Sequence, residues 1–422
     1  MDKKLQQKQF AFEVVKRLRD AGFEALWAGG CVRDYLLEKT PQDYDIATNA
    51  KPDEVRVVFG HHRTLAIGAS FGVITVLGNP SQGQIDVATF RQDTGYSDGR
   101  HPDSIRFSSA KEDALRRDFT VNGLFYDPIE SKVIDYVSGQ DDIRKKIIRA
   151  IGNPEDRIAE DKLRMLRAVR FAATYEFQLE AGTLAAIQRN AAGISMVSRE
   201  RIAAEFRRMF AHANRALAIK YLKRSYLLER VFHAPGLIDH TRVEEDSELA
   251  DLLETGRFET ALAAFLIPRL KLDYQKNQPV KQLGKILNQW KLSNDESRLV
   301  VWLSNSSAVL LNGAPDCWPK IQRLLVHEEA EELIALCTAI SKSESGRFDA
   351  NIEYSRRQLA LPPELLNPQP ILNGDDLKSA GFSPGPRFKK VLDLVRDRQL
   401  TGLIHTVEEA LQFATDRLVR KD

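Results

Sequence analysis

Residues 29–48 read GGCVRDYLLEKTPQDYDIAT, and the end of this stretch places Asp43 and Asp45 two residues apart at the start of a β-like run. Side chains at that spacing point to the same face of a strand, so the two carboxylates could share magnesium ions. Taken alone, an Asp-x-Asp pair is more often part of a solvated loop. The neighbouring motifs therefore decide between the two interpretations.

The beginning of the same stretch is a glycine turn, with Gly29 and Gly30 ahead of Arg33 and Asp34. Glycine allows a turn whose backbone N–H groups come close to a ligand, and a guanidinium beside it can bind phosphate oxygens. The turn is thus a candidate site for a nucleoside triphosphate. Cys31 lies inside it with no histidine nearby and is expected to be a small packed residue.

The chain as a whole has 422 residues, which is enough for two to four domains or a series of helical modules. Hydrophobic residues make up 43% and charged residues 28%, as in soluble globular proteins. No apolar run approaches the roughly 18 residues that a membrane span needs, and the N-terminus lacks a secretory signal. Three scattered cysteines support neither a disulfide framework nor a zinc site. The sequence therefore predicts a cytoplasmic protein.

The charge of the chain is nearly balanced, with 61 basic against 59 acidic residues and a net charge of +2. The distribution is uneven, because residues 144–208 hold 14 Lys and Arg but only 8 Asp and Glu. A local basic surface near the middle of the chain is consistent with a nucleic-acid partner, although the total charge alone does not establish one.

Two kinds of pattern follow one another along the chain. A helix is predicted over residues 5–21, and short β-like runs follow at 24–29, 44–48, 71–78 and 84–91. The last two runs flank GNPSQG, which suits a hairpin or a longer turn. From about residue 141 onward helical periods dominate to the end. The predicted fold class is therefore α+β, an α/β head followed by an elongated, all-helical remainder.

A third carboxylate stands in QIDVATFR, where alternation places Asp86 on the opposite face from Ile85 and Val87. On a strand next to Asp43 and Asp45, Asp86 could supply a further metal ligand. An ordinary polar residue at the start of a strand is an equally good interpretation.

The segment RRDFTVNGLFYDP, residues 116–128, begins where a helix-like run ends. Arg116 and Arg117 close that run, Asp118 could order the turn, and Asn122 could bond backbone or a sugar hydroxyl. A double arginine is more commonly a solvated helix end. Before this segment, YSDGRHPDSIRF has the composition of a mobile surface loop.

Residues 153–171, NPEDRIAEDKLRMLRAVRF, predict a helix with Asn153 as N-cap and Pro154 at its first position. Further on, Arg201 and Glu205 are spaced for an ion pair that would brace this helix rather than form a site.

Within the predicted helix, Asp161, Arg164, Arg167 and Arg170 recur every three residues and would form a slanting ridge. The first pair, Asp161 and Arg164, could act together on the edge of one base. The carboxylate would accept a hydrogen bond from the amino group of cytosine or adenine, and the guanidinium would donate to the neighbouring ring atom. Uracil and guanine present the reverse order, so this pair would select C and A. Arg167 and Arg170 are better placed for phosphates, an ion pair or a domain junction. The plain alternative for the first pair is a solvated salt bridge.

The three motifs GGCVRDYLLEKTPQDYDIAT, RRDFTVNGLFYDP and AEDKLRMLRAVRF, in this order and at these distances, closely resemble the bacterial-type (class II) tRNA nucleotidyltransferase and poly(A) polymerase family. The resemblance covers residues 25–210 and returns near 373–402. It implies a polymerase beta-like nucleotidyltransferase fold. Its expected parts are a catalytic head at 1–140, a base-recognising neck at 141–212, a body at 213–300 and a tRNA-binding tail at 301–422.

The resemblance also implies residue roles. Asp43 and Asp45 would hold Mg²⁺, and Asp86 would join them as a catalytic carboxylate, although a Glu is common in the family at that position. Together with the candidates from the residues themselves, the predicted nucleotide-binding set is Gly29, Gly30, Arg33, Arg117, Asn122, Asp161, Arg164, Arg167 and Arg170. CTP and ATP would be the substrates and the tRNA 3′ end and acceptor stem the partner, with no membrane and no side-chain nucleophile involved.

The nucleotides added are less constrained by the motifs. A loop at 94–104 accompanies the change from C to A addition in the family, and RTLAIGASFGVITVL lacks the arginine-rich pattern of bacterial poly(A) polymerases. The favoured expectation is CCA addition, followed by CC-only or A-only addition and by poly(A) synthesis. A tRNA-binding protein with an inactive head is the alternative from another class.

Overall fold

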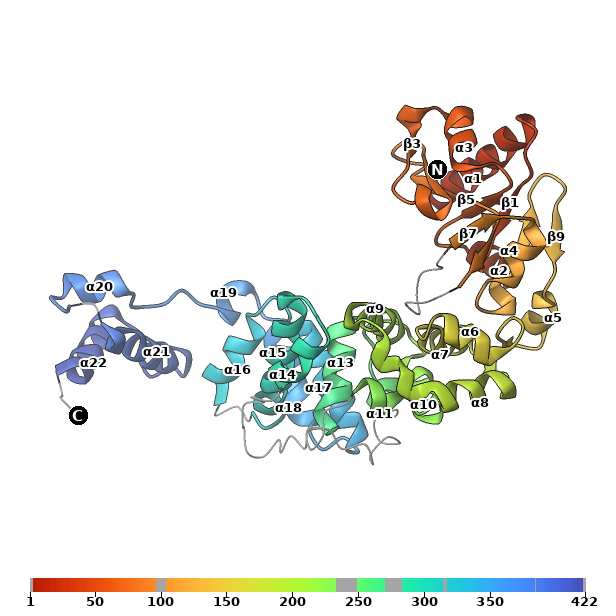
Figure 1. The fold of residues 1–422 in the computed structure, drawn as a ribbon. Helices are drawn as coiled ribbons and strands as arrows, with labels where there is room; N and C mark the ends of the chain where they lie inside the picture. The colour runs from red at the N-terminus through yellow and green to blue at the C-terminus, as the bar shows by residue number, and fades with distance from the viewer. Residues whose placement is uncertain are drawn as a thin grey trace. The chain divides into compact units, whose positions relative to one another are not determined.

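The computed structural model describes residues 3–95, 104–232, 249–269, 283–313, 317–383 and 385–419. The chain divides into two compact units, Met1–His233 and Ala234–Asp422, which are described separately below (Figure 1). Among the described residues, none of the helices combines the length and the apolar character that crossing a membrane requires.

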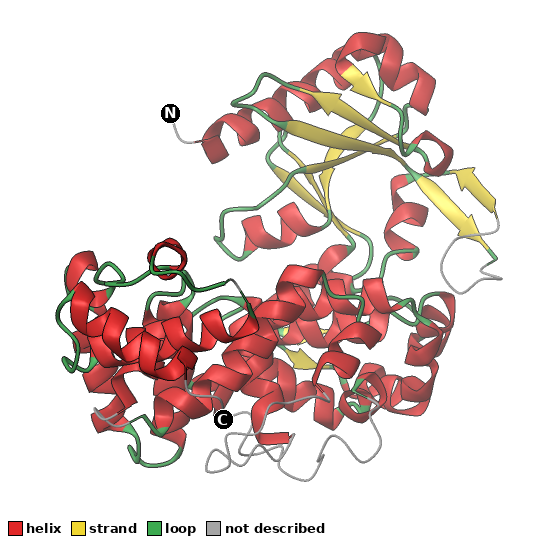
Figure 2. Cartoon of the chain, turned by 90° about the vertical axis from the view of Figure 1, so that its left-hand side faces the viewer, coloured by secondary structure: helices red, strands yellow, loops and turns green. Residues whose placement is uncertain are grey.

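The first unit contains a mixed sheet, whose strands are among the yellow arrows of Figure 2. The sheet has seven strands in the order β3-β4-β5-β2-β1-β8-β9. Only β2 and β5 run parallel, and the other neighbours are antiparallel. All four β-like runs of the sequence are strands here. The strands are β1 (Ala25–Ala28), β2 (Asp45–Thr48), β3 (Thr64–Leu65), β4 (Val73–Leu77), β5 (Gln84–Thr89), β8 (Leu124–Asp127) and β9 (Lys132–Asp135).

Alternation explains why these strands form. In β5, Ile85 and Val87 are buried while Asp86 is exposed, as the sequence pattern predicts. The turn between β4 and β5 closes with Gly78 N–H donating to the Gly83 carbonyl at 2.9 Å, which confirms the hairpin. Around the sheet lie the helices α1 (Lys3–Asp20), α2 (Gly30–Leu36), α3 (Pro52–Phe59), α4 (Ala110–Leu115) and α5 (Gly139–Arg144), and the short 3₁₀ turns η1 (His61–Arg63), η2 (Ala69–Phe71) and η3 (Thr120–Asn122).

The core that supports the site lies between the sheet and α4. Ala110 and Ala114 of α4 pack with Leu26 and Phe125 of the sheet and with Phe90. The small alanines let the helix approach closely, and the aromatic rings of Phe90 and Phe125 meet edge to face at 5.8 Å. Because α4 ends at Leu115, this packing fixes the start of the 116–128 segment.

A two-stranded ribbon extends from the head, formed by β6 (Arg91–Thr94) and β7 (Ser104–Phe107). Thr94 pairs with Ser104, so the ribbon frames the predicted loop at 94–104. Residues 96–103 of that loop lie outside the described part of the chain.

The rest of the first unit is helical, as predicted, with one exception. Ile147–Ile148 and Gln178–Leu179 form a small parallel pair, β10 and β11, so the neck is not wholly helical. Two-residue strands carry no period, which is why the sequence pattern missed them. The helices are α6 (Pro154–Glu160), α7 (Arg164–Tyr175), α8 (Ala181–Asn190), α9 (Arg199–Phe210), α10 (Arg215–Arg224) and α11 (Leu227–Val231), with a 3₁₀ turn η4 (Ala191–Met196).

The described part of the second unit is made of helices. Residues 371–418 have an apolar core of their own, built around Leu377, Val391 and Ala410. The four-part division predicted from the sequence stays a prediction. The helices are α13 (Phe258–Arg269), α14 (Leu283–Gln289), α15 (Asn294–Leu311), α16 (Trp318–Leu325), α17 (Ala330–Ser343), α18 (Asp349–Leu359), α19 (Pro363–Leu366), α20 (Gly374–Ser379), α21 (Pro386–Leu400) and α22 (Val407–Val419).

Candidate active site

A pocket of about 650 Å³ lies in the first unit, between the head sheet and residues of α7 and α9. It gathers ten of the twelve predicted site residues, and only Asp43 and Arg170 do not line it. The ten are Gly29, Gly30, Arg33, Asp45, Asp86, Arg117, Asn122, Asp161, Arg164 and Arg167. Three motifs far apart in the sequence therefore meet at one place.

The carboxylate end of the pocket is set by strand register. Asp45 on β2 is the direct partner of Asp86 on β5, so both side chains leave the same face of the sheet. Thr75 on β4 donates a hydrogen bond from Oγ1 to Asp86 Oδ1 at 2.5 Å. Asp43 precedes β2, which begins at Asp45. Asp43 therefore lies just outside the strand, and the expectation that its side chain leaves the same face as that of Asp45 stays a prediction.

Asp45 has an unfavourable electrostatic environment for a carboxylate. Partial loss of hydration raises its pKa above the usual range, against the attraction of Arg117, and repulsion from Asp86 and Asp43 raises it further. The residue is exposed at the pocket wall, so the lost hydration comes from the protein on its other sides. A cation placed between these carboxylates would relieve the repulsion.

In the described part of the chain, no group of three or more His, Cys, Asp or Glu side chains is already arranged around a common point for a metal. The donor chemistry nevertheless fits magnesium, which binds carboxylate oxygens and keeps several waters instead of requiring a cage of protein ligands. Asp45 and Asp86 are such oxygens, side by side on one face.

The glycine turn brings backbone and Arg117 into close approach. Gly29 has a φ of 71°, in the region that favours glycine, and its N–H donates to the Leu124 carbonyl at 3.0 Å. A Cβ at Gly29 would stand 2.8 Å from Arg117 Nη1. The turn after β1 therefore leaves room for the guanidinium beside the start of α2.

Arg33 is held by the protein on several sides. Its Nη1 donates to Asn122 Oδ1 at 2.5 Å, and its Nε and Nη2 donate to Asp34 Oδ1 at 3.0 and 2.8 Å. Its guanidinium also lies 4.3 Å from the centre of the Tyr175 ring, whose hydroxyl donates to Asp34 at 2.8 Å. Burial raises the pKa of Tyr175 to about 12, so this hydroxyl keeps its proton. Arg33 thus joins α2, the 116–128 segment and α7, and its triphosphate contact stays a prediction.

Asp113 does not line the pocket but holds Arg116 and Arg117, which do, and the sequence interpretation missed it. It is 1% exposed and accepts from Arg116 through Oδ1 at 2.6 Å and from Arg117 through Oδ2 at 3.0 Å. Burial raises the pKa of such a carboxyl, but the charges of Arg117 and Arg116 together hold it below its usual range. The two arginines are therefore a fixed pair on a buried anion rather than a solvated helix end. Their spacing from Asp113, three and four residues, was the available signal.

The predicted helix over 153–171 is interrupted at Asp161. Asn153 caps α6 as expected, with Oδ1 accepting from Glu155 N–H at 3.1 Å. Asp161 is extended, with φ −149° and ψ 106°, and its Oδ1 accepts from Leu163 N–H at 3.0 Å. The single ridge is therefore wrong for Asp161, because an aspartate bonds its own backbone more readily than it continues a helix.

Asp161 and Arg164 still line the pocket together, but each has another partner. Arg201 of α9 donates to both oxygens of Asp161, at 3.1 and 2.7 Å. Arg164 Nη1 donates to Glu160 Oε2 at 2.5 Å. The expected pair of Arg201 with Glu205 is wrong, since Arg201 reaches back to Asp161. No local pattern signals a contact across 40 residues.

The other two arginines of α7 form ion pairs with buried carboxylates, one of the alternatives that the sequence left open. Arg167 donates to Asp118 Oδ2 through Nε at 2.8 Å and Nη2 at 2.6 Å. Against the cost of burial, the charge of Arg167 and the hydrogen bonds from Asn122 and Arg167 lower the pKa of Asp118 to about 2. Arg170 Nε donates to Glu205 Oε2 at 2.6 Å. Arg167 borders the pocket, whereas Arg170 ties α7 to α9.

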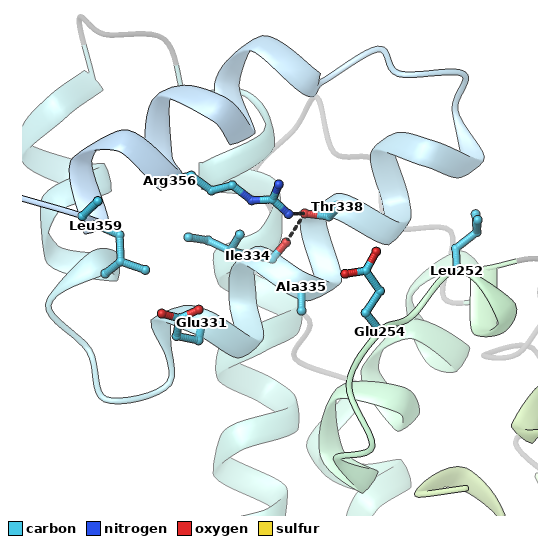
Figure 3. Close-up of a pocket in the computed structure, with 9 residues that line it drawn as sticks. Leu252, Glu254, Glu331, Ile334, Ala335, Thr338, Arg356 and Leu359 are labelled. Carbon is cyan, nitrogen blue, oxygen red and sulfur yellow. Dashed lines mark hydrogen bonds between the residues drawn. The ribbon is translucent and has the colours of Figure 1, made fainter. Parts of the chain in front are cut away.

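A second pocket, of about 430 Å³, lies in the second unit beside α17 and α18 (Figure 3). Arg356 points to Thr338, with Nη2 donating to Oγ1 at 3.0 Å (Figure 3). Glu254 at its edge pairs with Lys342 at 2.8 Å. None of the predicted site residues lies there, so the pocket of the first unit is the candidate active site.

Comparison with known proteins adds independent information. Family models match in three places: the poly A polymerase head domain at residues 25–149, the probable RNA and SrmB-binding site of polymerase A at 176–240, and a putative tRNA nucleotidyltransferase domain 2 at 270–414. The CCA-adding enzyme of Limosilactobacillus fermentum is 34% identical over 96% of each chain. This chain belongs to the CCA-adding enzyme family. The CCA-adding enzyme of Limosilactobacillus reuteri is 36% identical, over 90% of this chain and 89% of that one.

Solved structures of CCA-adding enzymes have the same fold. The Bacillus stearothermophilus CCA-adding enzyme in complex with CTP aligns with a TM-score of 0.74 and 27% identity, over 99% of this chain and 98% of that one. The Thermotoga maritima CCA-adding enzyme complexed with tRNA aligns with a TM-score of 0.67 and 18% identity, over 97% and 95%. The family resemblance and the nucleotidyltransferase head followed by a mostly helical remainder are confirmed.

Proposed function

We propose that this member of the CCA-adding enzyme family extends the 3′ end of tRNA with CTP and ATP, without a template, and releases pyrophosphate. The observation that carries the proposal is the pocket itself, because it has carboxylates at one end and an Asp161–Arg164 end suited to a base. The relatives that match almost the whole chain are named CCA-adding enzymes.

The reaction joins the 3′-oxygen of the RNA to the α-phosphorus of the nucleotide and breaks the bond to pyrophosphate. Asp43 and Asp45 would hold Mg²⁺ with Asp86 beside them, and the ion would supply positive charge to the reacting phosphate and the leaving group. The register pairing of Asp45 with Asp86 supports this assignment, because it places two carboxylates side by side. Their repulsion adds to the loss of hydration, which is the main cause of the raised pKa of Asp45.

The phosphates would lie against the glycine turn. The Gly29 N–H already donates to Leu124, so the N–H groups at the start of α2, with Arg33 and Arg117 beside them, would provide the donors for phosphate oxygens. Arg117 is already held by its hydrogen bond to Asp113, so binding of the nucleotide would not have to order this side chain. Asn122 would contact the nucleotide next to Arg33.

The base would be read by Asp161 and Arg164, with Arg167 and Arg170 supporting them. A carboxylate offers about four lone-pair sites, and Asp161 uses three of them on Arg201 and the Leu163 N–H, which leaves one for a base amino group. Arg164 likewise keeps N–H donors beyond its bonds to Glu160 and to backbone. Cytosine and adenine satisfy this pair, and uracil and guanine do not.

One experiment tests the activity. Purified protein and magnesium are incubated with tRNA transcripts that end before CCA, after CC and after CCA, with labelled CTP and ATP supplied separately and together. We expect addition to the first two transcripts only, ending at CCA. Long A tails on any RNA would identify a poly(A) polymerase, and extension of only one transcript would identify a partial enzyme. No incorporation would favour a tRNA-binding protein.

Base selection has its own test. Replacing Asp161 with Ala should lower incorporation of CTP and ATP and reduce the discrimination against UTP, with roughly 10- to 100-fold effects because one good base contact is worth about 1 to 3 kcal/mol. The matched control is Asp141→Ala, an exposed aspartate of α5 away from the pocket. Unchanged discrimination would remove Asp161 from the base site.

The working compartment proposed for the protein is the cytoplasm, where tRNA maturation and a reducing environment coincide. All three cysteines, Cys31, Cys317 and Cys337, are free, and burial raises the pKa of the Cys31 thiol to about 12. Such a thiol is a packing residue rather than a nucleophile.

A further inference from the structure

One row of register partners crosses the head sheet at the level of the carboxylates. Ala28 on β1 pairs with Asp45, Asp45 with Asp86, Asp86 with Thr75 on β4, and Thr75 with Leu65 on β3. Partners in such a row project from one face, and neighbouring strands are about 4.8 Å apart. Leu65 therefore stands on the carboxylate face about 10 Å beyond Asp86.

The strand order separates the two substrates of the reaction. The residues assigned to the nucleotide lie on the β1 and β8 side of the carboxylates, since Gly29 follows β1 while Arg117 and Asn122 precede β8. In a phosphoryl transfer of this kind the attacking oxygen and the leaving group lie roughly in line on opposite sides of the phosphorus. With the triphosphate on the β1 and β8 side, the RNA end would reach the α-phosphate from the opposite side, which is the side of β4 and β3.

The surface on that side is open and apolar. Leu65 is 40% exposed and Ile67 is 89% exposed, although both are aliphatic. Val73 and Thr75 on the same face of β4 are half-buried, whereas Ile74 and Val76 on the other face belong to the core. The sheet face beyond the carboxylates therefore exposes aliphatic side chains. Such a surface suits a flat, weakly polar group such as a nucleobase.

A positive charge stands at the same edge. Arg63 is exposed two residues before Leu65, and it forms no ion pair with any part of the chain that the structure describes. Two further exposed side chains, His61 and His62, precede it. An RNA backbone that enters over β3 would meet this basic end before its last base reaches Leu65.

We propose that the exposed face of β4 and β3 is the subsite for the 3′-terminal nucleotide of the RNA, with its base packed on Leu65 and its phosphate next to Arg63. The inference rests on the proposed nucleotide transfer and names the surface that holds the acceptor. Thr75, which donates to Asp86, lies between this subsite and the carboxylates and acts as a positioning residue.

The test measures steady-state kinetics of CTP addition to a tRNA transcript that ends before CCA. Leu65→Ala should raise the KM for tRNA about three- to tenfold, the loss expected for one half-exposed aliphatic contact, and leave the KM for CTP unchanged. Leu65→Tyr should keep or lower the KM for tRNA, because an aromatic ring stacks on any base. A merely structural role of Leu65 would not be improved by tyrosine. Arg63→Ala should reduce the salt dependence of tRNA binding by about one charge.

Leu5→Ala is the matched control, since Leu5 is a 53% exposed leucine of the same unit that lines a different pocket. The contact is localised by a transcript whose last nucleotide lacks its base but keeps the 3′-hydroxyl. On that RNA the wild type and Leu65→Ala should have the same KM, because the partner of Leu65 is gone.

Three outcomes overturn the inference. If Leu65→Ala and Leu5→Ala have the same KM for normal tRNA, no base lies on Leu65. If the KM difference between the wild type and Leu65→Ala persists on the abasic transcript, the contact of Leu65 is not with the terminal base. A raised KM for CTP would assign Leu65 to the nucleotide side. If the wild type transfers no nucleotide at all, the proposed function fails first, whereas normal wild-type transfer with unaffected variants removes only this subsite.

Discussion

The two ends of the pocket are built in opposite ways. At the carboxylate end, Asp45 and Asp86 are placed by strand register and repel each other, and no arginine or lysine is salt-bridged to either within the described chain. At the other end each arginine is already fixed on an anion, Arg117 on Asp113 and Arg167 on Asp118. The comparison teaches that one end would need a cation from solution to relieve its repulsion, while the other is ordered in advance by ion pairs of the protein.

The largest effect is expected at the carboxylate end. Asp45→Ala should lower nucleotide transfer by roughly a thousandfold or more, since in the proposed reaction the cation at the reacting phosphate would be held by this carboxylate. Binding of tRNA, measured by filter retention, should stay nearly intact because Asp45 is one exposed residue. Unchanged turnover would remove Asp45 from the catalytic site.

A large loss of stability is expected at the arginine end. Asp113→Ala leaves Arg116 and Arg117 without their shared buried anion and should cost about 3 to 5 kcal/mol of unfolding free energy in urea titrations. Asp141→Ala removes an exposed i, i+3 pair with Arg144 and should cost at most about 1 kcal/mol. Similar losses in both variants would show that the two arginines do not depend on Asp113.

The pair of Asp118 and Arg167 should give a smaller effect with a defined pH dependence. The pKa of Asp118 is lowered from 3.8 to about 2, so its ionised form stabilises the fold above pH 3.8, and this contribution is lost as the pH falls through about 2. At 1.36 kcal/mol per pKa unit the contribution is roughly 2 kcal/mol. Asp118→Asn should therefore be less stable than the wild type at pH 7, with a difference that shrinks toward pH 3. A constant difference between pH 7 and pH 3 would contradict it.

The smallest effect has the opposite sign. The pKa of Asp45 is raised in the folded protein, so ionising this carboxyl lowers the stability of the fold. The destabilisation is absent at a pH below the pKa of the unfolded chain and is complete at a pH above the pKa of the folded protein. With a chelator present, Asp45→Asn should be more stable than the wild type at pH 7 by less than about 1 kcal/mol, because the exposed carboxylate is screened. Added magnesium should raise the melting temperature of the wild type more than that of the variant. Equal shifts would argue against a metal at Asp45.

Much of the fold could be predicted where the pattern was periodic. The four runs that alternate or carry β-branched residues became β1, β2, β4 and β5, and the stripe of Phe10, Val14 and Leu18 is the buried face of α1. The strand β8 was missed because Leu124–Asp127 is buried on both faces and four residues long, so it has neither alternation nor length. The continuous helix failed at Asp161, where a side-chain bond to backbone overrides the helical period.

The site was predictable as a set of residues but not as a set of contacts. The sequence motifs identified Asp45, Arg117 and Asp161 separately, because each motif carries its own chemistry, and all three line one pocket. The partners that hold these groups lie on other elements, as Arg201 does for Asp161, and single-sequence patterns contain no information on such distant pairs. Tertiary contacts of this kind follow only from the packed arrangement of the sheet and helices.

The glycine turn limits how the family member can change over time. Gly29 faces two separate obstacles, a left-handed φ of 71° and an Arg117 atom 2.8 Å from where a Cβ would stand. No single compensating substitution removes both, since a smaller residue at 117 would leave the backbone strain and a relaxed turn would leave the clash. Position 29 is therefore closed to neutral drift, and selection from a library randomised there should return glycine alone.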